Sequence, residues 1–523
     1  MKINQKKQPQ EKSHLNHMGG VSYSINNPIQ KLKIVCSSCF FGEPMYYHND
    51  NSTESTKNKD YDDSTYKYLE NVLGDVINIP NYHNLKPSTL IEKVIDEALD
   101  YDSKATILEA IRLRKEDHIR VTPQVIMVRA ANHDKVRGTN LISTYNLDVM
   151  SRTDDAITQF AYQKEVFGKP IPNSLKKSWK KFLELKSEYD LAKYKLNNKK
   201  YKLVDLVNIC HAFSPSIDKL MKGNLNNNEN TWESFISKNG SKTETWSSAV
   251  DLMGHMALLR NIRNFIEHDV NESLYIDKLL NGVKQGQQLP FRYYSAYNAV
   301  SNSNKQASGK ILDTIEQCLE ISLENLPVFN GNVISLCDNS GSAQNTTTSD
   351  MGTVKISDIA NLTGVITGKK SENGYVGVFG DNLEIMPIRK TSSTFDQVKQ
   401  MNALAENIGQ GTEHGIWLFF EKALEEKQHW DHIFIYSDQQ AGTGGLYGNP
   451  SKYRDYMWKK QRNIDVAALI KEYRQKVNKN VNVYLVQVAG YQDAIAPSYF
   501  NKTYLLGGWG EGLLKFAHSV SQK

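Results

Sequence analysis

Three oxygen-bearing side chains follow an apolar run at alternate positions of the sequence. The stretch VISLCDNSGSA, residues 333–343, has four apolar residues among its first five and continues with Asp338, Ser340 and Ser342. Alternate residues of an extended segment point to the same side, so these three side chains can converge on one small volume. Carboxylate and hydroxyl oxygens suit a hard divalent cation such as Mg²⁺. The spacing therefore predicts a cation site.

Two later segments offer oxygens of the same kind. Thr412 lies in the glycine-rich turn GQGTEHG just before a predicted helix, and Asp438 directly follows the run HIFIYS. Ligands of open α/β sheets bind beyond the carboxyl ends of the strands, where such residues meet. The simpler alternative is that Asp338, Thr412 and Asp438 only cap helices. We favour a cation-binding site without a catalytic base or nucleophile, with the predicted ligands Asp338, Ser340, Ser342, Thr412 and Asp438.

The elements that would position these oxygens are visible in the last third of the chain. Short β-branched or aromatic runs alternate there with helical stretches, which predicts a doubly wound, mostly parallel α/β sheet over residues 328–523. The predicted strands are 332–337, 374–380, 432–437 and 481–488, and the predicted helices are 354–366, 394–407, 413–427 and 462–477.

Residues 21–327 form a separate predicted module, whose texture is helical from about residue 82 onward. Apolar residues recur at spacings of three and four, as in 87–115 and 247–269, which predicts medium-length amphipathic helices joined by short polar segments. Such a run is typical of an α-solenoid, with a domain boundary near 325–331. Residues 1–20 are predicted to form a disordered tail, and the polar tract 48–70 a surface insertion.

Positive charge is concentrated in one short region. Residues 169–202 hold eleven lysines and three acidic residues, a net charge of +8, whereas the whole chain carries +5. A local basic patch suggests a polyanionic partner, and the alternative is a solvated lysine-rich helix face. The interleaved aromatics could stack on unpaired bases or belong to the core; they are Trp179, Phe182, Tyr189, Tyr194 and Tyr201. The candidate phosphate contacts are Lys176, Lys180, Lys193, Lys195, Lys199 and Lys200, with a second group of Arg129, Lys135 and Arg137.

Length and composition limit the class of protein. A chain of 523 residues is expected to form two or more domains. The sequence has no apolar run of about 18 residues and no secretory signal, and its five cysteines suit a reducing cytoplasm. Cys36 and Cys39 form a CxxC pair, which we interpret as buried small hydrophobes and less readily as a metal or redox site.

Four stretches resemble the TROVE module of the Ro autoantigen family. They are FFGEPMYY (40–47), LVDLVNICHAFSP (203–215), MALLRNIRNF (256–265) and QQLPFRYYSAY (287–297). The DxSxS–Thr–Asp set, in turn, resembles the metal-ion-dependent adhesion site of von Willebrand factor A-type domains, which follow the TROVE module in that family. MALLRNIRNF holds an arginine pair and an asparagine pair, each at three-residue spacing: Arg260 with Arg263, and Asn261 with Asn264. These side chains either tie neighbouring helices together, or the arginine pair faces phosphate.

The resemblance implies a ring of HEAT-like helical repeats closed against the A-type domain. It also implies structured Y-type RNA on the outer surface and single-stranded ends of misfolded RNA in the central hole. Lys193-Tyr194-Lys195 aligns with a family Lys-Tyr-Lys segment and His211 with a family histidine, both on the RNA-binding surface. Asn197 stands where the family has a basic residue. In the cation site, Ser340, Ser342 and Thr412 would bind directly, and the two aspartates directly or through water.

These observations lead to three competing functions. The first is a cytoplasmic, monomeric RNA-binding protein of a small noncoding RNA ribonucleoprotein, without catalytic activity, acting in RNA quality control with an exoribonuclease. The second is an adaptor that grips a protein partner through its cation while the lysines are only solvated. The third, an RNA-processing enzyme, ranks lowest because no paired carboxylates or histidine constellation stands out.

Overall fold

The computed structural model describes most of the chain. The described residues are 13–15, 20–38, 87–194, 200–225, 231–286, 288–303, 305–345, 354–409, 413–439, 465–488, 493–497, 501–508 and 511–522. The predicted insertion 48–70 lies outside them, as do Cys39, Lys195, Lys199 and Thr412.

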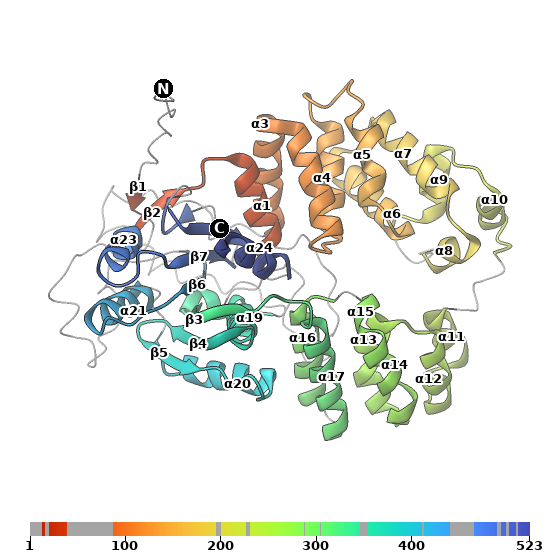
Figure 1. The fold of residues 1–523 in the computed structure, drawn as a ribbon. Helices are drawn as coiled ribbons and strands as arrows, with labels where there is room; N and C mark the ends of the chain where they lie inside the picture. Colours follow the sequence, from red (N-terminus) through yellow and green to blue (C-terminus); the bar gives the residue numbers. More distant parts are fainter. Residues whose placement is uncertain are drawn as a thin grey trace, which may run out of the picture.

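Helices account for most of the structure from Pro28 to Ser322, and we call this part the helical array. Its first half consists of α1 (Pro28–Ser38), α3 (Pro87–Lys115), α4 (Val121–Asn132), α5 (Leu141–Val149), α6 (Thr153–Tyr162), α7 (Asn173–Glu184), α8 (Glu188–Lys193), α9 (Leu203–Cys210) and α10 (Pro215–Met221). Its second half consists of α11 (Trp232–Asn239), α12 (Thr243–Ala249), α13 (His255–Glu267), α14 (Ile276–Asn281), α15 (Val283–Gly286), α16 (Pro290–Ser301) and α17 (Gly309–Ser322). Figure 1 shows the first half in an arc above the second.

Helices occupy the stretches that were singled out for their apolar spacing, since 87–115 forms α3 and 247–269 contains α13. In α13 the stripe of Leu258, Leu259, Ile262 and Phe265 is buried, while Arg260 faces solvent. Hydroxyl caps define several starts, since these side chains accept hydrogen bonds from the otherwise unpaired N–H groups of a first turn. Examples are Ser214 before α10 and Ser308 before α17.

A six-stranded sheet follows the helical array. It has the order β5-β4-β3-β6-β7-β9, and all neighbours are parallel except the β4–β5 hairpin. The strands are β3 (Phe329–Asp338), β4 (Ser371–Phe379), β5 (Leu383–Pro387), β6 (His432–Ser437), β7 (Asn482–Gln487) and β9 (Thr503–Gly507). Each predicted strand overlaps one of these, and β5 and β9 are additional edge strands.

Helices cover both faces of this sheet. They are α18 (Gly341–Asn345), α19 (Ile356–Lys369), α20 (Thr394–Ala405), α21 (Glu413–Glu425), α23 (Val466–Lys476) and α24 (Glu511–Ser521). Alternate strand residues belong to different cores. Val333 packs with residues of α19, and Ile334 packs with residues of α21 and α23. The predicted doubly wound α/β arrangement is therefore present, and the core under α19 continues into the helical array.

Both ends of the helical array contact this sheet unit. At one end α1 approaches β9 so closely that a Cβ on Gly507 would lie 2.6 Å from the Ile34 Cα. At the other end α16 and α17 bond to α19 and α20. For example, Lys399 Nζ donates a hydrogen bond of 2.9 Å to Tyr297 Oη. Figure 1 shows the sheet unit between these two ends.

The N-terminal region contributes a second, small sheet. Residues 13–15, which the sequence analysis placed in a disordered tail, form β1 (Ser13–Leu15) and pair antiparallel with β2 (Val21–Ser24). β2 in turn pairs with β8 (Asp493–Ala494), so segments from the first and last tenths of the chain meet in one sheet. Among the described helices, none has the length and apolarity needed to cross a membrane.

Candidate cation site and basic surface

Strand pairing brings the two aspartates of the predicted cation site to the same edge of the sheet. Asp338 ends β3, and its neighbour Cys337 lies opposite Tyr436 of the parallel strand β6. The Ser437 hydroxyl, at the end of β6, donates a hydrogen bond of 2.8 Å to Asp338 Oδ2. Asp438 comes next in the chain, so both carboxylates stand beyond carboxyl ends of adjacent strands.

The loop after β3 completes the cluster. The Ser340 N–H donates to Asp338 Oδ1 at 3.0 Å, and the hydroxyls of Ser340 and Ser342 are 3.1 Å apart. The Ser342 hydroxyl donates to Asp438 Oδ2 at 3.0 Å. Four of the five predicted ligands therefore lie together, and the fifth, Thr412, is outside the described residues.

Helix capping does not account for the position of Asp338. Its carboxylate accepts hydrogen bonds from the Ser340 N–H, which precedes α18, and from Ser437 on another strand. Capping fits Ser340 better, because its hydroxyl accepts from the Ala343 N–H of α18 at 3.4 Å. The capping alternative, which was made for the aspartates and Thr412, is therefore wrong for Asp338, and the cap of α18 is Ser340.

Burial makes a cation chemically suitable here. Asp338 is fully buried and Asp438 is 2% exposed. Burial raises the pKa of Asp338, while hydrogen bonds from Ser340, Ser437 and the Asp438 N–H act in the opposite direction. A divalent cation would offset both the burial and the repulsion between two carboxylates.

The donor set also fits such an ion. Two carboxylates and two hydroxyls are hard oxygen donors of the kind that Mg²⁺ prefers. Within the described ranges, no group of three or more His, Cys, Asp or Glu side chains is arranged to hold a metal ion. The cluster here is a different kind of site, because half of its described donors are hydroxyls.

The predicted basic region forms a solvent-facing side of α7. Leu175, Trp179 and Leu183 are buried, so the lysines between them are directed outward. Lys180 is exposed, and its Nζ lies 3.9 Å from Glu184 Oε1. Lys176 is half-buried, and the neighbouring Lys177 and Lys181 are exposed. An exposed i,i+4 pair of this kind contributes little to stability and leaves Lys180 accessible.

The predicted lysines farther along the chain have different surroundings. Lys193 is exposed at the end of α8, and its Nζ lies 5.8 Å from the ring centroids of Tyr189 and Tyr194. Lys200 is exposed and pairs with Glu165 at 2.5 Å. That hydrogen bond raises the pKa of Lys200 and lowers the pKa of Glu165.

His211 ends α9 in a left-handed conformation, with φ of +53°. Its side chain is exposed. Two residues later Phe213 is 71% exposed, and its N–H donates to Glu184 Oε1 at 3.0 Å. The predicted histidine therefore lies near the C-terminal end of α7, close to the lysine-bearing helix.

The second predicted basic group divides into two parts. The Arg129 side chain is 13% exposed and donates hydrogen bonds to Asp96 and Tyr162, at 2.7 Å from Nε and Nη1. These contacts tie α4 to α3 and α6, so the Arg129 guanidinium is committed to holding helices together and not to a phosphate. Lys135 and Arg137 are exposed in the turn after α4.

The aromatic residues also divide. Trp179 and Phe182 are buried, and the Trp179 indole N–H donates to Gln159 Oε1 at 2.8 Å. They belong to the core, as the alternative reading of the sequence held. Tyr189, which is 41% exposed, stays available for stacking. Tyr194 lies under the Arg152 guanidinium, 5.0 Å from its carbon.

The contacts described for MALLRNIRNF stay within α13, so neither interpretation of its arginines and asparagines is tested. Asn261 is buried and donates to the Ala257 carbonyl, and Asn264 donates to Asn261 Oδ1, both at 2.9 Å. Arg263 lies 3.4 Å from Glu267.

Cys36 is fully buried, which agrees with its interpretation as a small hydrophobe.

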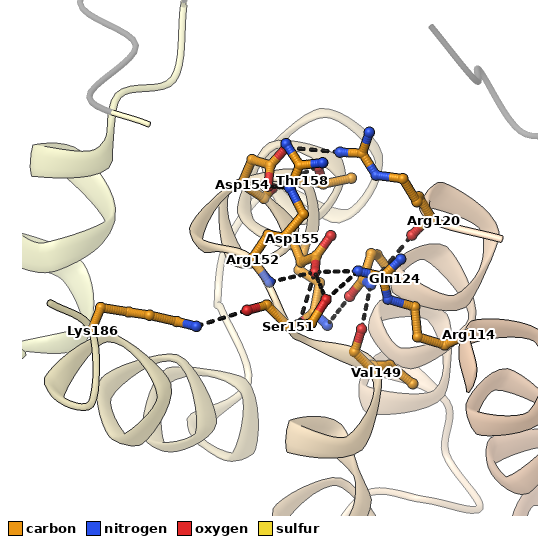
Figure 2. Close-up of polar contacts among 11 residues, drawn as sticks. Arg114, Arg120, Gln124, Val149, Ser151, Arg152, Asp154, Asp155, Thr158 and Lys186 are labelled. Atoms are coloured by element: carbon orange, nitrogen blue, oxygen red, sulfur yellow. Dashed lines mark hydrogen bonds and ion pairs between the residues drawn. The ribbon is translucent and has the colours of Figure 1, made fainter. Parts of the chain in front are cut away.

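Sequence reasoning missed a second cluster of positive charge. Figure 2 shows Arg114 and Arg120 directed toward Asp155 and Asp154, at 2.9 and 2.8 Å, with Lys186 reaching the Ser151 carbonyl. Arg152 lies 3.1 Å from Asp154 as well. Arg114 belongs to α3, Arg120 and Arg152 directly precede α4 and α6, and Lys186 follows α7, so only the fold brings these cations together. The local signal was the run Ser151-Arg152-Thr153-Asp154-Asp155 at the start of α6.

The fold and these sites define a class of protein, a helical array joined to a doubly wound α/β unit. The TROVE domain family matches residues 218–354. The fold is similar to that of the Deinococcus radiodurans Ro (RSR) protein, with a TM-score of 0.57 and 12% sequence identity over 81% of this chain and 93% of that one. A comparison with curated proteins found no match. The sequence motifs predicted a TROVE module, and the family match over residues 218–354 and the similar fold of a solved Ro protein agree with that prediction.

Proposed function

We propose that this chain is an RNA-binding protein of the Ro type that acts without catalysing a reaction. The helical array would close into a ring of HEAT-like repeats against a von Willebrand factor A-type unit. Support for closure comes from the two ends of the array, since α1 approaches β9 and α17 bonds to α20. The TROVE match at residues 218–354 is the single observation that most directly supports the RNA-binding class.

The RNA would be held mainly through its phosphates. Exposed lysines on α7 and α8, above all Lys180 and Lys193, give sequence-independent contacts to a polyanion. His211, Lys135 and Arg137 are also exposed on the first half of the array, and together with these lysines they would hold a structured small noncoding RNA of the Y type. Single-stranded ends of misfolded RNA would enter the central hole and be presented to an exoribonuclease in cytoplasmic RNA quality control.

The cation site would serve binding. Asp338, Ser340, Ser342 and Asp438, with Thr412, would hold Mg²⁺, and the bound ion would supply an open coordination position for an acidic group of a partner. The described residues supply the positioning: Ser340 and Ser342 are held by each other and by the two aspartates.

Crosslinking in the host cell tests the RNA-binding proposal. RNA crosslinked to the full chain by ultraviolet light is sequenced, and the crosslinked peptides are mapped by mass spectrometry. We expect one abundant structured small RNA and crosslinks in α7, α8 or the residue 211 region. Recovery of no RNA above an untagged control would contradict the proposal.

A protein adaptor is the second candidate, favoured by the convergence of four hard oxygen donors at one sheet edge. An adaptor would bind a partner that carries an exposed carboxylate, and chelation by EDTA would release it. The same purification discriminates the two functions. A chelator-sensitive protein without RNA supports the adaptor, and RNA that stays bound after EDTA supports the Ro-type function.

A further inference from the structure

A buried asparagine stands inside the candidate cation-site loop. Asn339 lies between Asp338 and Ser340 and is 1% exposed. Because neighbouring residues of an extended segment point to opposite sides, its side chain leaves the loop away from the proposed ligands. A buried amide must find hydrogen-bond partners, and these partners fix the loop from behind.

The partner of Asn339 is Asn361 of α19, which is fully buried. The two amides bond reciprocally, since each side-chain N–H donates to the other's oxygen at 2.8 Å. The second N–H of Asn361 donates to Asn402 Oδ1 of α20, also at 2.8 Å. One side chain thus joins the cation-site loop to α20.

The series of side-chain hydrogen bonds continues into the helical array. The Asn402 amide donates to Tyr294 Oη of α16 at 3.1 Å, and the Tyr294 hydroxyl lies 3.4 Å from Asp358 Oδ1. From Asn361 onward each group donates to the next one, and the last acceptor is the Asp358 carboxylate. Hydrogen bonds arranged in such a series strengthen one another. The loop after β3 and the helices α19, α20 and α16 are therefore connected through side chains that are buried or half-buried.

We propose that Asn361 and Asn402 are positioning residues that hold the cation-site loop and connect it to Tyr294, so that cation binding and the ordering of α16 are coupled. This inference rests on the cation site of the proposed function and goes beyond it, because it relates the sheet unit to the TROVE part of the chain. Residues behind a metal ligand orient it, and their loss commonly weakens metal binding by 10- to 100-fold. Coupling is reciprocal, so a cation that orders the loop also orders α16.

The test measures Mg²⁺ binding and amide hydrogen exchange of the full chain. Isothermal titration calorimetry with Mg²⁺ compares wild type with Asn361→Ala, for which we expect a Kd raised about tenfold or more. Hydrogen exchange in α16, residues 290–301, is followed with and without saturating Mg²⁺. In wild type we expect Mg²⁺ to slow it about fivefold, the low end of typical coupling between sites.

Two tyrosine variants of α16 distinguish an effect of these hydrogen bonds from an effect of helix packing in general. Tyr294→Phe removes only the hydroxyl in the chain, and we expect it to bind Mg²⁺ within about twofold of wild type but to lose the response of α16. Tyr297→Phe is the matched control, because the Tyr297 hydroxyl accepts a hydrogen bond from Lys399 of α20 and takes no part in the Asn339–Asp358 series. It should keep both the Mg²⁺ affinity and the α16 response of wild type.

The outcomes separate this inference from the cation proposal. Wild-type chain that binds no Mg²⁺ overturns the cation site, and the inference with it. Wild-type chain that binds Mg²⁺ while Asn361→Ala binds equally well, or while α16 exchange ignores Mg²⁺, overturns the inference alone. Loss of the α16 response in Tyr297→Phe as well as Tyr294→Phe would also contradict it.

Discussion

The contact between α17 and the sheet unit leads to a prediction whose size follows from the structure. Lys369, at the end of α19, is 10% exposed and bonds to Glu320 of α17. Its Nζ also donates to the Ser392 carbonyl at 3.1 Å and to Thr394 Oγ1 at 2.9 Å. Glu320 in turn accepts from the Thr394 hydroxyl, at the start of α20. Glu320→Ala therefore removes the only carboxylate that the described contacts give Lys369 and an acceptor near a helix N-terminus.

The expected loss is moderate. Breaking a fully buried ion pair costs about 3–5 kcal/mol. Glu320 is 41% exposed, so solvent screens the pair, and Lys369 keeps two neutral acceptors. We therefore expect the free energy of unfolding, measured by urea denaturation, to fall by about 1–3 kcal/mol. Glu320→Gln should lose less, because it retains an acceptor.

A nearby glutamate on the same segment is the control. Glu324 pairs with Lys284 at 3.0 Å, but both side chains are more than half exposed. Glu324→Ala should stay within about 0.5 kcal/mol of wild type. Equal losses for Glu320→Ala and Glu324→Ala would refute the claim that this contact joins the array to the sheet unit more strongly than a surface ion pair.

Three further predictions follow from single side chains. Burial lowers the pKa of His432 to about 4. As the pH falls, the unfolded chain therefore protonates His432 first, near pH 6.5, and the free energy of unfolding decreases between pH 6.5 and 4 by up to roughly 3 kcal/mol. His432→Phe should make the urea midpoint depend less on pH over this range. An unchanged pH dependence would argue against a buried neutral imidazole. Mg²⁺ at 100 times its Kd should stabilise wild type by about 2.7 kcal/mol in thermal denaturation but not Asp338→Asn, and equal shifts would exclude Asp338 from the site. Arg129→Met should lower the free energy of unfolding by about 1–3 kcal/mol, because the buried Tyr162 hydroxyl and the 46%-exposed Asp96 lose their shared donor. RNA affinity should be unchanged, and the reverse result would return Arg129 to the RNA surface.

The sequence predicted the parts of the fold whose signals are local. The four central strands are runs of β-branched and aromatic residues, and α13 has a regular apolar stripe. The edge strands were missed because β5 is short and ends at Pro387, and β9 has no clear alternation. The small sheet could not be predicted, since Tyr23 pairs with Ala494 across almost the whole chain.

The candidate sites follow the same rule. Asp338, Ser340, Ser342 and Asp438 were predictable because each stands at or just after a strand end, and parallel strands bring those ends together. Arg129 was judged from its neighbours in sequence, but its partners Asp96 and Tyr162 lie 33 residues away on either side.

The amide chain was equally invisible in the sequence. Asn339 lies in a loop, and Asn361, Asn402 and Tyr294 lie on three different helices. Nothing in the residue types marks one asparagine as a partner of another. Their relation depends on the packing of α19 and α20 against α16, which only the folded chain provides.

The salt dependence of RNA binding tests the central claim most directly. Affinity of the full chain for the crosslinked small RNA is measured from about 50 to 200 mM salt for wild type, for Lys180→Glu with Lys193→Glu, and for a control pair, Lys284→Glu with Lys476→Glu. Each lost phosphate contact lowers the slope of log affinity against log salt by about 0.7–0.9, so the first pair should bind more weakly with a slope reduced by roughly 1.5. The control pair, whose lysines are exposed on other parts of the chain, should match wild type. Equal slopes for all three proteins would contradict the account.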